Sequence, residues 1–420
     1  MRILRVTAVP RTKEAGVSGV LLHSGDALTR MGHDVEYLFG ENLLRAPVPP
    51  WLSVVVLPVM TCFRILQHAR RSHFDVVEIH RPFAWIYALL SGSRLFRRRL
   101  APCVLQCQGL EELLWETMRV GRAQAGLPMS WRSRGLYRLM VFQARLASRF
   151  ATGMAVPTER DVGYVVEKLG IPISQVTRVP NGTEPSFFTV PRSTAPACLR
   201  VLFFGSWLDR KGAPDLVRAW ATVQQCCPST SLTVAGCGCK PDEVRDSFHP
   251  RSRDALEVIP NVPRSEVLDL FARHDVLVLP SWYEGMPLAV LEAAASGMAV
   301  VATRIAGTTD IFRAADPERD GAILIDVHSH RGLAKAVCRL AEDRALLGEL
   351  QAGARRRAAL FTWESSARSF AAAYEKALSA PSARRPQSNQ HARVFPSRRD
   401  VPGNPRRPLC TPAQRRSRRR

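Results

Sequence analysis

Short apolar runs alternate along the chain with longer segments of helical periodicity. In the first half we expect strands at Ile3–Val9, Asp34–Phe39, Asp75–Ile79, Cys103–Gln106, Gly153–Val156 and Val176–Val179. A helix is predicted over Val20–Met31, with Gly32 after it, so the first two strands are separated by the crossover that parallel pairing requires. The pattern predicts a doubly wound parallel α/β domain over residues 1–190.

The same alternation begins again after a proline-rich segment, Glu184–Ala197, which we interpret as a linker. Further strands are predicted at Leu199–Phe204, Ser231–Ala235, Leu256–Pro260, Asp275–Pro280, Ala299–Thr303 and Gly321–Ile325. The run 276–279 is apolar on both faces, as in a central parallel strand covered by helices on both sides. A second Rossmann-like domain over 198–362 follows, and the two domains are expected to face a cleft at the carboxyl ends of their strands.

Charge is unevenly distributed over the 420 residues, and half of the net charge of +22 lies in residues 381–420. This tail holds twelve arginines and seven prolines but few large apolar side chains, so we predict that it is disordered. Its charge would allow non-specific contact with nucleic acid or anionic lipid, although a solvated extension without such a role is the preferred interpretation. The rest has the composition of a globular protein, with 46% hydrophobic residues overall.

The ten cysteines lack the paired spacing of a structural zinc site, which favours free thiols in a reducing compartment and a cytoplasmic protein. The N-terminal apolar run is too short for a signal peptide. The longest apolar stretch, Trp51–Leu66, has 16 residues and is interrupted by Pro58 and Arg64. We therefore predict no membrane-spanning helix.

Residues 280–303 carry the most specific chemical signal. A strand ends at Pro280, Glu284 and Gly285 follow in a loop, and a helix is expected to begin near Pro287. Gly285 would let the backbone approach a ligand, and unpaired amides within 286–289 would bind a diphosphate at the positive end of the helix. The predicted donor-binding residues of this segment are Gly285, Met286, Pro287, Leu288 and Glu292. Because Glu292 has apolar neighbours, a purely solvated role is disfavoured.

Glu284 and Glu292 together resemble the E-x7-E motif of the family 4 glycosyltransferases, which are retaining enzymes with the two-domain GT-B fold. The resemblance extends over about residues 1–378. It implies that Glu292 binds the ribose of a nucleotide-sugar donor, UDP- or GDP-linked. It also implies that Glu284 and the amides after it hold the donor sugar and phosphates.

Residues 203–212, FFGSWLDRKG, resemble the family's strand and loop that open the second domain. The resemblance implies that Lys211 stabilises the negative charge of the leaving diphosphate. Ser206 stands where many relatives have arginine, and Arg210 is a possible substitute. Read alone, this basic pair would be a solvated turn.

The first domain carries weaker signals. Gly16 and Gly19 resemble the family's glycine-rich loop, which approaches the donor phosphate between the first strand and the first helix. Gln108 stands where the family has a histidine beside the reacting sugar, and glutamine cannot take up a proton there. His80 is a second imidazole at a strand end, and a structural role is at least as well supported. The pair Glu111 and Glu112 would be explained by the dipole of the helix that they begin.

Two further segments fit the resemblance. Residues 156–188 are similar to the end of the family's first domain, and residues 363–378 are similar to its C-terminal helix, which crosses back to the first domain. No Asp-x-Asp pair lies at a strand end, so we expect metal-independent transfer without a cofactor. Retention of configuration would follow a same-face internal-return route, as the family implies.

Basic and apolar residues are mixed at Arg94–Arg99 and at Trp131–Phe150, where contact with an anionic membrane or an ordinary basic surface would both fit. The leading hypothesis is a glycosyltransferase that acts on a glycan or a lipid-linked saccharide. One alternative is a GT-B protein that epimerises a nucleotide sugar. Another is a sugar- or nucleic-acid-binding protein without catalysis.

Overall fold

The computed structural model of the protein describes residues 1–380 except 14–15, 45–47, 97, 125, 128, 192–197, 314–315 and 317. The described residues belong to one compact unit, Met1–Ala380. The predicted disordered tail, 381–420, lies outside the described residues, as does part of the predicted linker.

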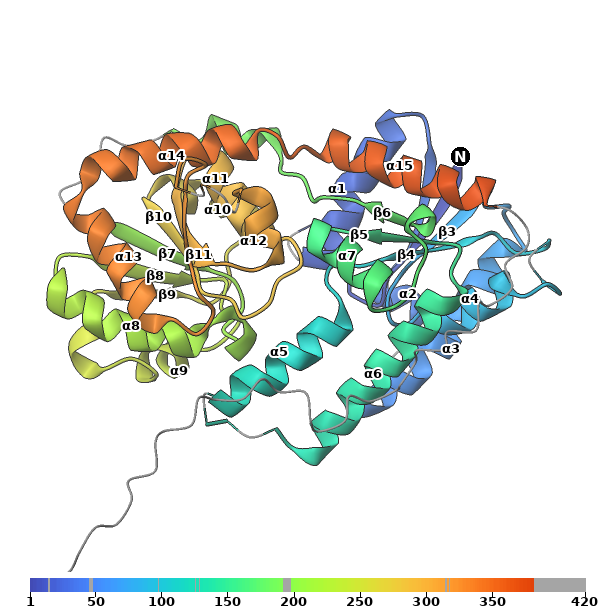
Figure 1. Ribbon diagram of the computed structural model, residues 1–420, viewed down its shortest axis with the longest axis horizontal. Coiled ribbons are helices and arrows are strands. Elements are labelled where there is room, and N and C mark those ends of the chain that lie inside the picture. The colour runs from blue at the N-terminus through green and yellow to red at the C-terminus, as the bar shows by residue number, and fades with distance from the viewer. Residues whose placement is uncertain are drawn as a thin grey trace, which may run out of the picture. The chain divides into compact units, whose positions relative to one another are not determined.

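Two parallel sheets of six strands each form the framework (Figure 1). The first has the order β2-β1-β3-β4-β5-β6, with β1 (Arg2–Val6), β2 (Asp34–Leu38), β3 (Val76–His80), β4 (Cys103–Gln106), β5 (Gly153–Val156) and β6 (Val176–Arg178). The second has the order β12-β11-β10-β7-β8-β9, with β7 (Arg200–Phe204), β8 (Ser231–Ala235), β9 (Leu256–Ile259), β10 (Val276–Leu279), β11 (Ala299–Thr303) and β12 (Ala322–Ile325). The predicted doubly wound fold and its twelve strands are confirmed.

Helices connect the strands and flank both sheets. Those of the N-terminal half are α1 (Gly16–Arg30), α2 (Gly40–Leu43), α3 (Pro50–Ala69), α4 (Trp85–Gly92), α5 (Glu111–Gln124), α6 (Trp131–Phe150) and α7 (Glu159–Glu167). Those of the C-terminal half are α8 (Ala213–Cys226), α9 (Pro241–Asp246), α10 (Arg264–Ala272), α11 (Leu288–Ala295), α12 (Ala306–Ile311), α13 (His330–Glu342), α14 (Arg344–Ala358) and α15 (Trp363–Ser379). Short 3-10 turns are η1 (Ile173–Gln175), η2 (Pro185–Thr189), η3 (Asp209–Lys211) and η4 (Pro250–Ser252).

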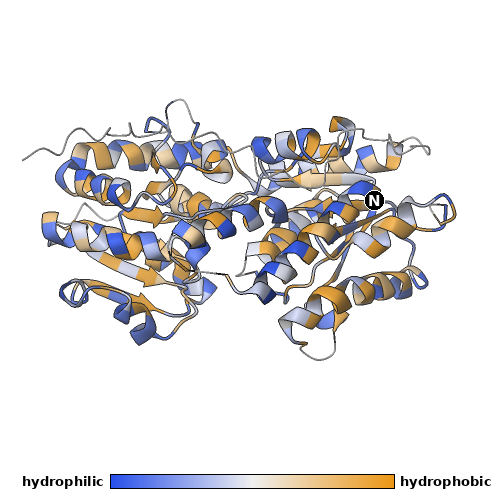
Figure 2. Ribbon diagram, turned by 60° about the horizontal axis from the view of Figure 1, so that its bottom comes forward, coloured by the Kyte–Doolittle hydropathy of each residue, from blue (hydrophilic) through white to orange (hydrophobic). Residues whose placement is uncertain are grey.

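Successive strand residues face opposite layers of core, so most strand positions are apolar (Figure 2), although strands such as β1, β2 and β3 also carry charged residues. In β1, Leu4 packs with one buried cluster and Ile3 with the other, which includes residues of α1 and α15. No strand follows α15 among the described residues, and the helix completes this layer of the first sheet. The predicted return of the C-terminal helix to the first domain is confirmed.

A buried ionic cluster fixes α15 to the first sheet. Arg5 of β1 and Glu78 of β3 form an ion pair of 2.9 Å, and both side chains are almost fully inaccessible to solvent. The Tyr374 hydroxyl of α15 donates to the second carboxylate oxygen of Glu78, and Arg5 lies over the ring of Phe370, 4.7 Å from its centroid. The Glu78 carboxylate thus has one partner in the first sheet, Arg5, and one in the C-terminal helix α15, Tyr374.

The apolar stretch Trp51–Leu66 lies within helix α3. The helix continues beyond Leu66 to Ala69 and contains Pro58. By length and composition alone, its segment Trp51–Ala69 could cross a membrane. One side of the helix packs into the first domain through residues such as Leu57 and Ile65, so the helix belongs to the folded body.

Replacing Glu78 with glutamine is predicted to lower the free energy of unfolding by about 3–5 kcal/mol, because Arg5 then stays buried without a countercharge. Urea unfolding monitored by circular dichroism measures the change. The matched control is Glu36→Gln, which disrupts the solvent-accessible pair with Arg2 and should cost less than about 1 kcal/mol. Equal effects of the two substitutions would contradict a stabilising role of the buried cluster.

Candidate active site

A tight turn brings the basic pair to the first glutamate of the motif. After β7 the chain forms η3 and then Gly212, whose φ of 78° is left-handed. A Cβ atom at Gly212 would lie 2.0 Å from the carbonyl oxygen of Pro280, so only glycine allows η3 to approach the end of β10 this closely. The turn therefore places Lys211 and Arg210 beside the loop that carries Glu284.

Glu284 is engaged by three groups. Its Oε1 atom lies 2.6 Å from Nζ of Lys211, 3.7 Å from Nη1 of Arg210 and 3.1 Å from the donating hydroxyl of Ser281. The Glu284 side chain is 11% exposed. The structure thus joins three residues that were singled out separately in the sequence. Ser206 is exposed in the loop after β7.

Glu292 is buried on α11 and pairs with Arg264, the first residue of α10, at 2.9 Å. Burial raises the pKa of the Glu292 carboxyl, while the charge and hydrogen bond of Arg264 act in the opposite direction. Arg264 also pairs with Glu184 and lies over the ring of Phe187, 4.9 Å from its centroid. Arg264 therefore holds the second carboxylate of the motif and links it to the segment between the sheets.

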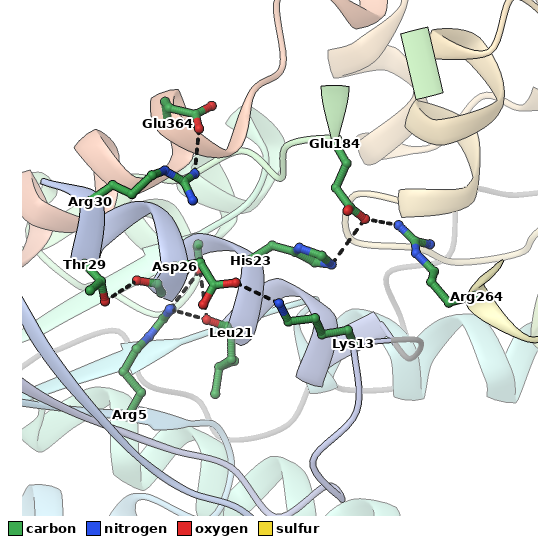
Figure 3. A network of polar contacts seen from close by, with 12 residues as sticks. Arg5, Lys13, Leu21, His23, Asp26, Thr29, Arg30, Glu184, Arg264 and Glu364 are labelled. Atoms are coloured by element: carbon green, nitrogen blue, oxygen red, sulfur yellow. Dashed lines mark hydrogen bonds and ion pairs between the residues drawn. The ribbon is translucent and has the colours of Figure 1, made fainter. Parts of the chain in front are cut away.

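This network extends to the first domain, as Figure 3 shows. His23 of α1 places Nε2 3.5 Å from the Glu184 carboxylate and stacks on Trp363, with ring centroids 5.3 Å apart. Burial lowers the pKa of His23, with Glu184 opposing and Arg264 reinforcing the shift. The lowered pKa favours a neutral imidazole at neutral pH.

The loop after β4 meets the loop before α11. A Cβ atom at Gly285 would lie 2.0 Å from the carbonyl oxygen of Gln108, so the missing side chain allows the backbones of the two loops to approach each other. The buried amide of Asn181 donates to the Met286 carbonyl at 2.8 Å and to Oε1 of Gln108 at 3.2 Å. The Tyr283 hydroxyl accepts a hydrogen bond from the Leu110 amide. Gln108, Gly285 and Met286 thus come together around Asn181.

The helix after this loop begins at Leu288, with Pro287 as its N-cap residue. Proline has no amide hydrogen, so within 286–289 only the other residues can donate to an anion. The eight residues of α11 are apolar apart from Glu292.

The expected glycine-rich loop forms the first turn of α1, at the expected helix N-terminus, and is not a separate loop before the helix. Gly16 is the first residue of α1 and Gly19 lies buried within the helix. A Cβ atom at Gly19 would lie 3.0 Å from the Lys13 carbonyl, so this glycine admits the preceding backbone. The start of α1 was predicted too late, at Val20, because small residues such as glycine and serine fit either a loop or the first turn of a helix.

His80 is the last residue of β3, and burial lowers its pKa to about 4.

A second expectation to correct concerns the start of α5. The dipole of the helix does not by itself explain Glu111 and Glu112, because both pair with the buried guanidinium of Arg81 at 2.8 Å. Burial raises the pKa of Glu111 to about 7, while Arg81 lowers it. These carboxylates anchor the loop after β4 rather than facing solvent.

Sequence reasoning missed Arg264, Glu184 and the contacts of Asn181. Arg264 follows the carboxyl end of β9 by a few residues, so a search for basic residues at strand ends would have found it. Asn181 carried only a turn signal, since its partners lie 73 and 105 residues away along the chain. Among the described residues, no group of three or more His, Cys, Asp or Glu side chains is arranged to hold a metal ion.

Comparison with known proteins bears directly on this site. Residues 15–187 match the family described as Glycosyltransferase Family 4, and residues 198–343 match the family described as Glycosyl transferases group 1. The chain belongs to the family 4 glycosyltransferases. The second match contains both glutamates, Lys211 and Arg264.

Individual relatives give the same family. The D-inositol 3-phosphate glycosyltransferase of Thermobispora bispora is 29% identical over 246 residues, which are 54% of this chain and 56% of the relative. The chain thus spans little more than half the length of the curated relatives it matches. The sucrose-phosphate synthase of Thermosynechococcus elongatus has a similar structure, with a TM-score of 0.68 and 17% identity over 89% of this chain and 98% of that one.

Anabaena HepE, solved in complex with UDP, gives a TM-score of 0.62 with 15% identity over 89% of this chain and 99% of that one. At these identities the solved structures establish the GT-B fold alone.

The Arg264→Met variant is predicted to lose stability mainly above the usual pKa of glutamate. Because burial raises the pKa of Glu292 in the folded state, stability falls as pH rises through that range, and removing Arg264 enlarges the fall. We expect little difference from wild type at about pH 4 and a deficit of about 2–3 kcal/mol at pH 7. Chemical unfolding across this pH range gives the measurement.

The second substitution Glu292→Gln, made in the Arg264→Met chain, serves as control and should abolish most of that pH dependence. A deficit that is the same at both pH values would show that Arg264 does not act on the ionised carboxylate.

Proposed function

We propose that the protein is a retaining, metal-independent glycosyltransferase that moves a sugar from a nucleotide diphosphate sugar to a glycan or lipid-linked acceptor. The single observation that carries the proposal is the contact of Lys211 with Glu284 at the loop before α11. The contact joins a cation of η3 to a carboxylate in the loop that precedes the N-terminus of α11. These are the groups needed to bind a diphosphate together with sugar hydroxyls.

Lys211 would neutralise charge on the departing nucleotide. In the ligand-free chain its ammonium group is paired with Glu284, so a diphosphate would share or replace that contact. Charge stabilisation at the leaving group is worth most when the cation is already in place and partly shielded from water. Lys211 is 17% exposed, which fits that requirement.

Glu292 would accept hydrogen bonds from the ribose hydroxyls. A carboxylate does so best when ionised, and Arg264 opposes the effect of burial on its pKa. Each motif carboxylate is thus already engaged by a cation, which favours roles in binding over covalent attack on the sugar. This supports the internal-return route for retention.

Gln108 would position the donor rather than exchange a proton. Its side-chain oxygen accepts from Asn181, so the group that it can offer to a ligand is an N–H donor. Glutamine in place of the family's histidine also favours the alternative of a sugar-binding protein without catalysis, and an epimerase is the other alternative. A labelled nucleotide sugar separates them, because transfer requires label in the acceptor, whereas epimerisation leaves it on the nucleotide.

Among the solved structures of this fold, HepE was determined with UDP, which supports a nucleotide diphosphate as the ligand of this chain as well.

Nucleoside diphosphates are predicted to raise the melting temperature of the full chain, and Glu292→Ala should weaken that binding about tenfold or more by removing hydrogen bonds to the ribose. Thermal shift with UDP, GDP and ADP, followed by calorimetry, provides the measurement. Glu257→Ala, an exposed glutamate on β9, is the control. Unchanged affinity in Glu292→Ala would remove the ribose role, and no shift with any nucleotide would argue against the proposal.

Lys211→Ala is predicted to lower kcat about 100-fold or more while leaving the fold intact, because leaving-group charge is then unmatched. The exposed Lys335 supplies the control substitution, Lys335→Ala.

Transfer from an identified donor is predicted to change by less than about twofold when EDTA is added. The reason is that Lys211 and backbone amides would stabilise the charge of the diphosphate, as a divalent ion does in metal-dependent enzymes. A strong loss with EDTA would overturn metal-independent transfer.

A further inference from the structure

Helix α3 leaves a line of large apolar side chains exposed. Trp51, Val55, Val59 and Phe63 are 63%, 54%, 53% and 56% exposed, and their spacing of four residues places them along one side of the helix. These four residues are called the α3 stripe below. Single exposed apolar residues are ordinary, whereas a continuous line of them marks a binding surface.

The opposite side of α3 is firmly packed. Leu57, Cys62 and Ile65 belong to the core of the first domain, and Thr61 is 1% exposed. Gln143 of α6 donates to the Val54 carbonyl at 3.0 Å, which joins the two helices. Although α3 is apolar enough to cross a membrane, doing so would expose this packed side and undo the core. The stripe is therefore placed to lie on a surface.

The neighbouring helix α6 extends the surface. Trp131 and Phe142 are 77% and 61% exposed. The helix also carries five exposed arginines and no acidic residue: Arg132, Arg134, Arg138, Arg145 and Arg149. Leu95, 76% exposed, follows α4, which packs against both α3 and α6. Apolar and cationic side chains therefore occur together on three adjoining segments.

The charge on these helices is positive. Together α3, α4 and α6 contain six arginines and neither aspartate nor glutamate. A second copy of the same surface would bring arginine against arginine, which disfavours a symmetric dimer through this face. Phosphates beside an apolar layer complement both features, since arginine binds phosphate and the stripe can enter acyl chains.

We propose that the α3 stripe, with Trp131 and Phe142 of α6, is a membrane-binding surface that takes a bilayer containing anionic phospholipids. The apolar side chains insert at the level of the headgroups, and the arginines of α6 meet lipid phosphates. The inference goes beyond the proposed function and does not depend on it, because it needs no nucleotide or sugar. The arginines of α6 were suspected from the sequence, whereas the stripe was concealed inside an ordinary apolar run.

The test is flotation of the full-length protein with vesicles of phosphatidylcholine, with and without phosphatidylglycerol. Wild type should float with the anionic vesicles. The double variant Val55→Ser, Phe63→Ser should bind them about tenfold or more weakly, because the inserting groups are gone. The double variant Arg134→Gln, Arg138→Gln should lose about fivefold per arginine with anionic vesicles and little with neutral ones.

Matched controls are Ile173→Ser, whose side chain is 61% exposed in η1, and Arg356→Gln, which is exposed on α14. Both should bind as wild type does. All variants keep residues 381–420, so any contribution of the basic tail is the same in each. Unchanged melting temperatures show that the variants fold.

Several results would overturn the proposal. Stripe variants that float as well as wild type would place binding elsewhere, for example on the tail. Failure of wild type to float would refute it directly. Retention in the membrane after alkaline carbonate extraction would mean that α3 spans the bilayer, and an oligomer broken by the stripe variants without lipid would mean that a second copy covers this face.

Discussion

The buried side-chain amide of Asn181 is the contact on which the arrangement of the site depends. It donates to the Met286 carbonyl of the second domain and to Gln108 of the first, where the backbones approach so closely that Gly285 has no room for a side chain. A buried amide that lost either partner would be costly, so the two loops are held at a defined distance. The order of strands in each sheet brings the loops to the correct edge, and Asn181 then fixes how they meet.

Around that junction, the charges of the second domain are arranged before any ligand binds. Lys211 and Arg264 each hold one carboxylate of the E-x7-E motif, and Arg264 also holds Glu184, which contacts His23 of the first domain. Preorganised charge lowers the cost of rearrangement when a substrate binds. The network also links the second domain to α1 through His23.

The sequence predicted what depends on local pattern. The parallel strands were recognised because buried strands are apolar on both faces, and the glutamate motif because its spacing spans one loop and one helix. The pairing of Arg264 with Glu292 could not be predicted, since the two residues are 28 positions apart and only the fold brings them together. Gly285 was singled out for a close approach of the backbone, and the structure places the backbone of Gln108 beside it. The exposed side of α3 could not be predicted, because an apolar sequence does not indicate which of its residues stay exposed to solvent after the core has packed.

The return of α15 makes the first domain discontinuous along the chain. Tyr374 completes the hydrogen bonding of Glu78, so a fragment that ends before α15 leaves a buried carboxylate short of a donor and one layer of the sheet bare. The second domain is, in topological terms, an insertion into the first. Chimeras that exchange donor specificity among relatives should therefore replace the internal second domain and keep both terminal segments of the recipient. A single crossover point would separate α15 from the first sheet, which it covers.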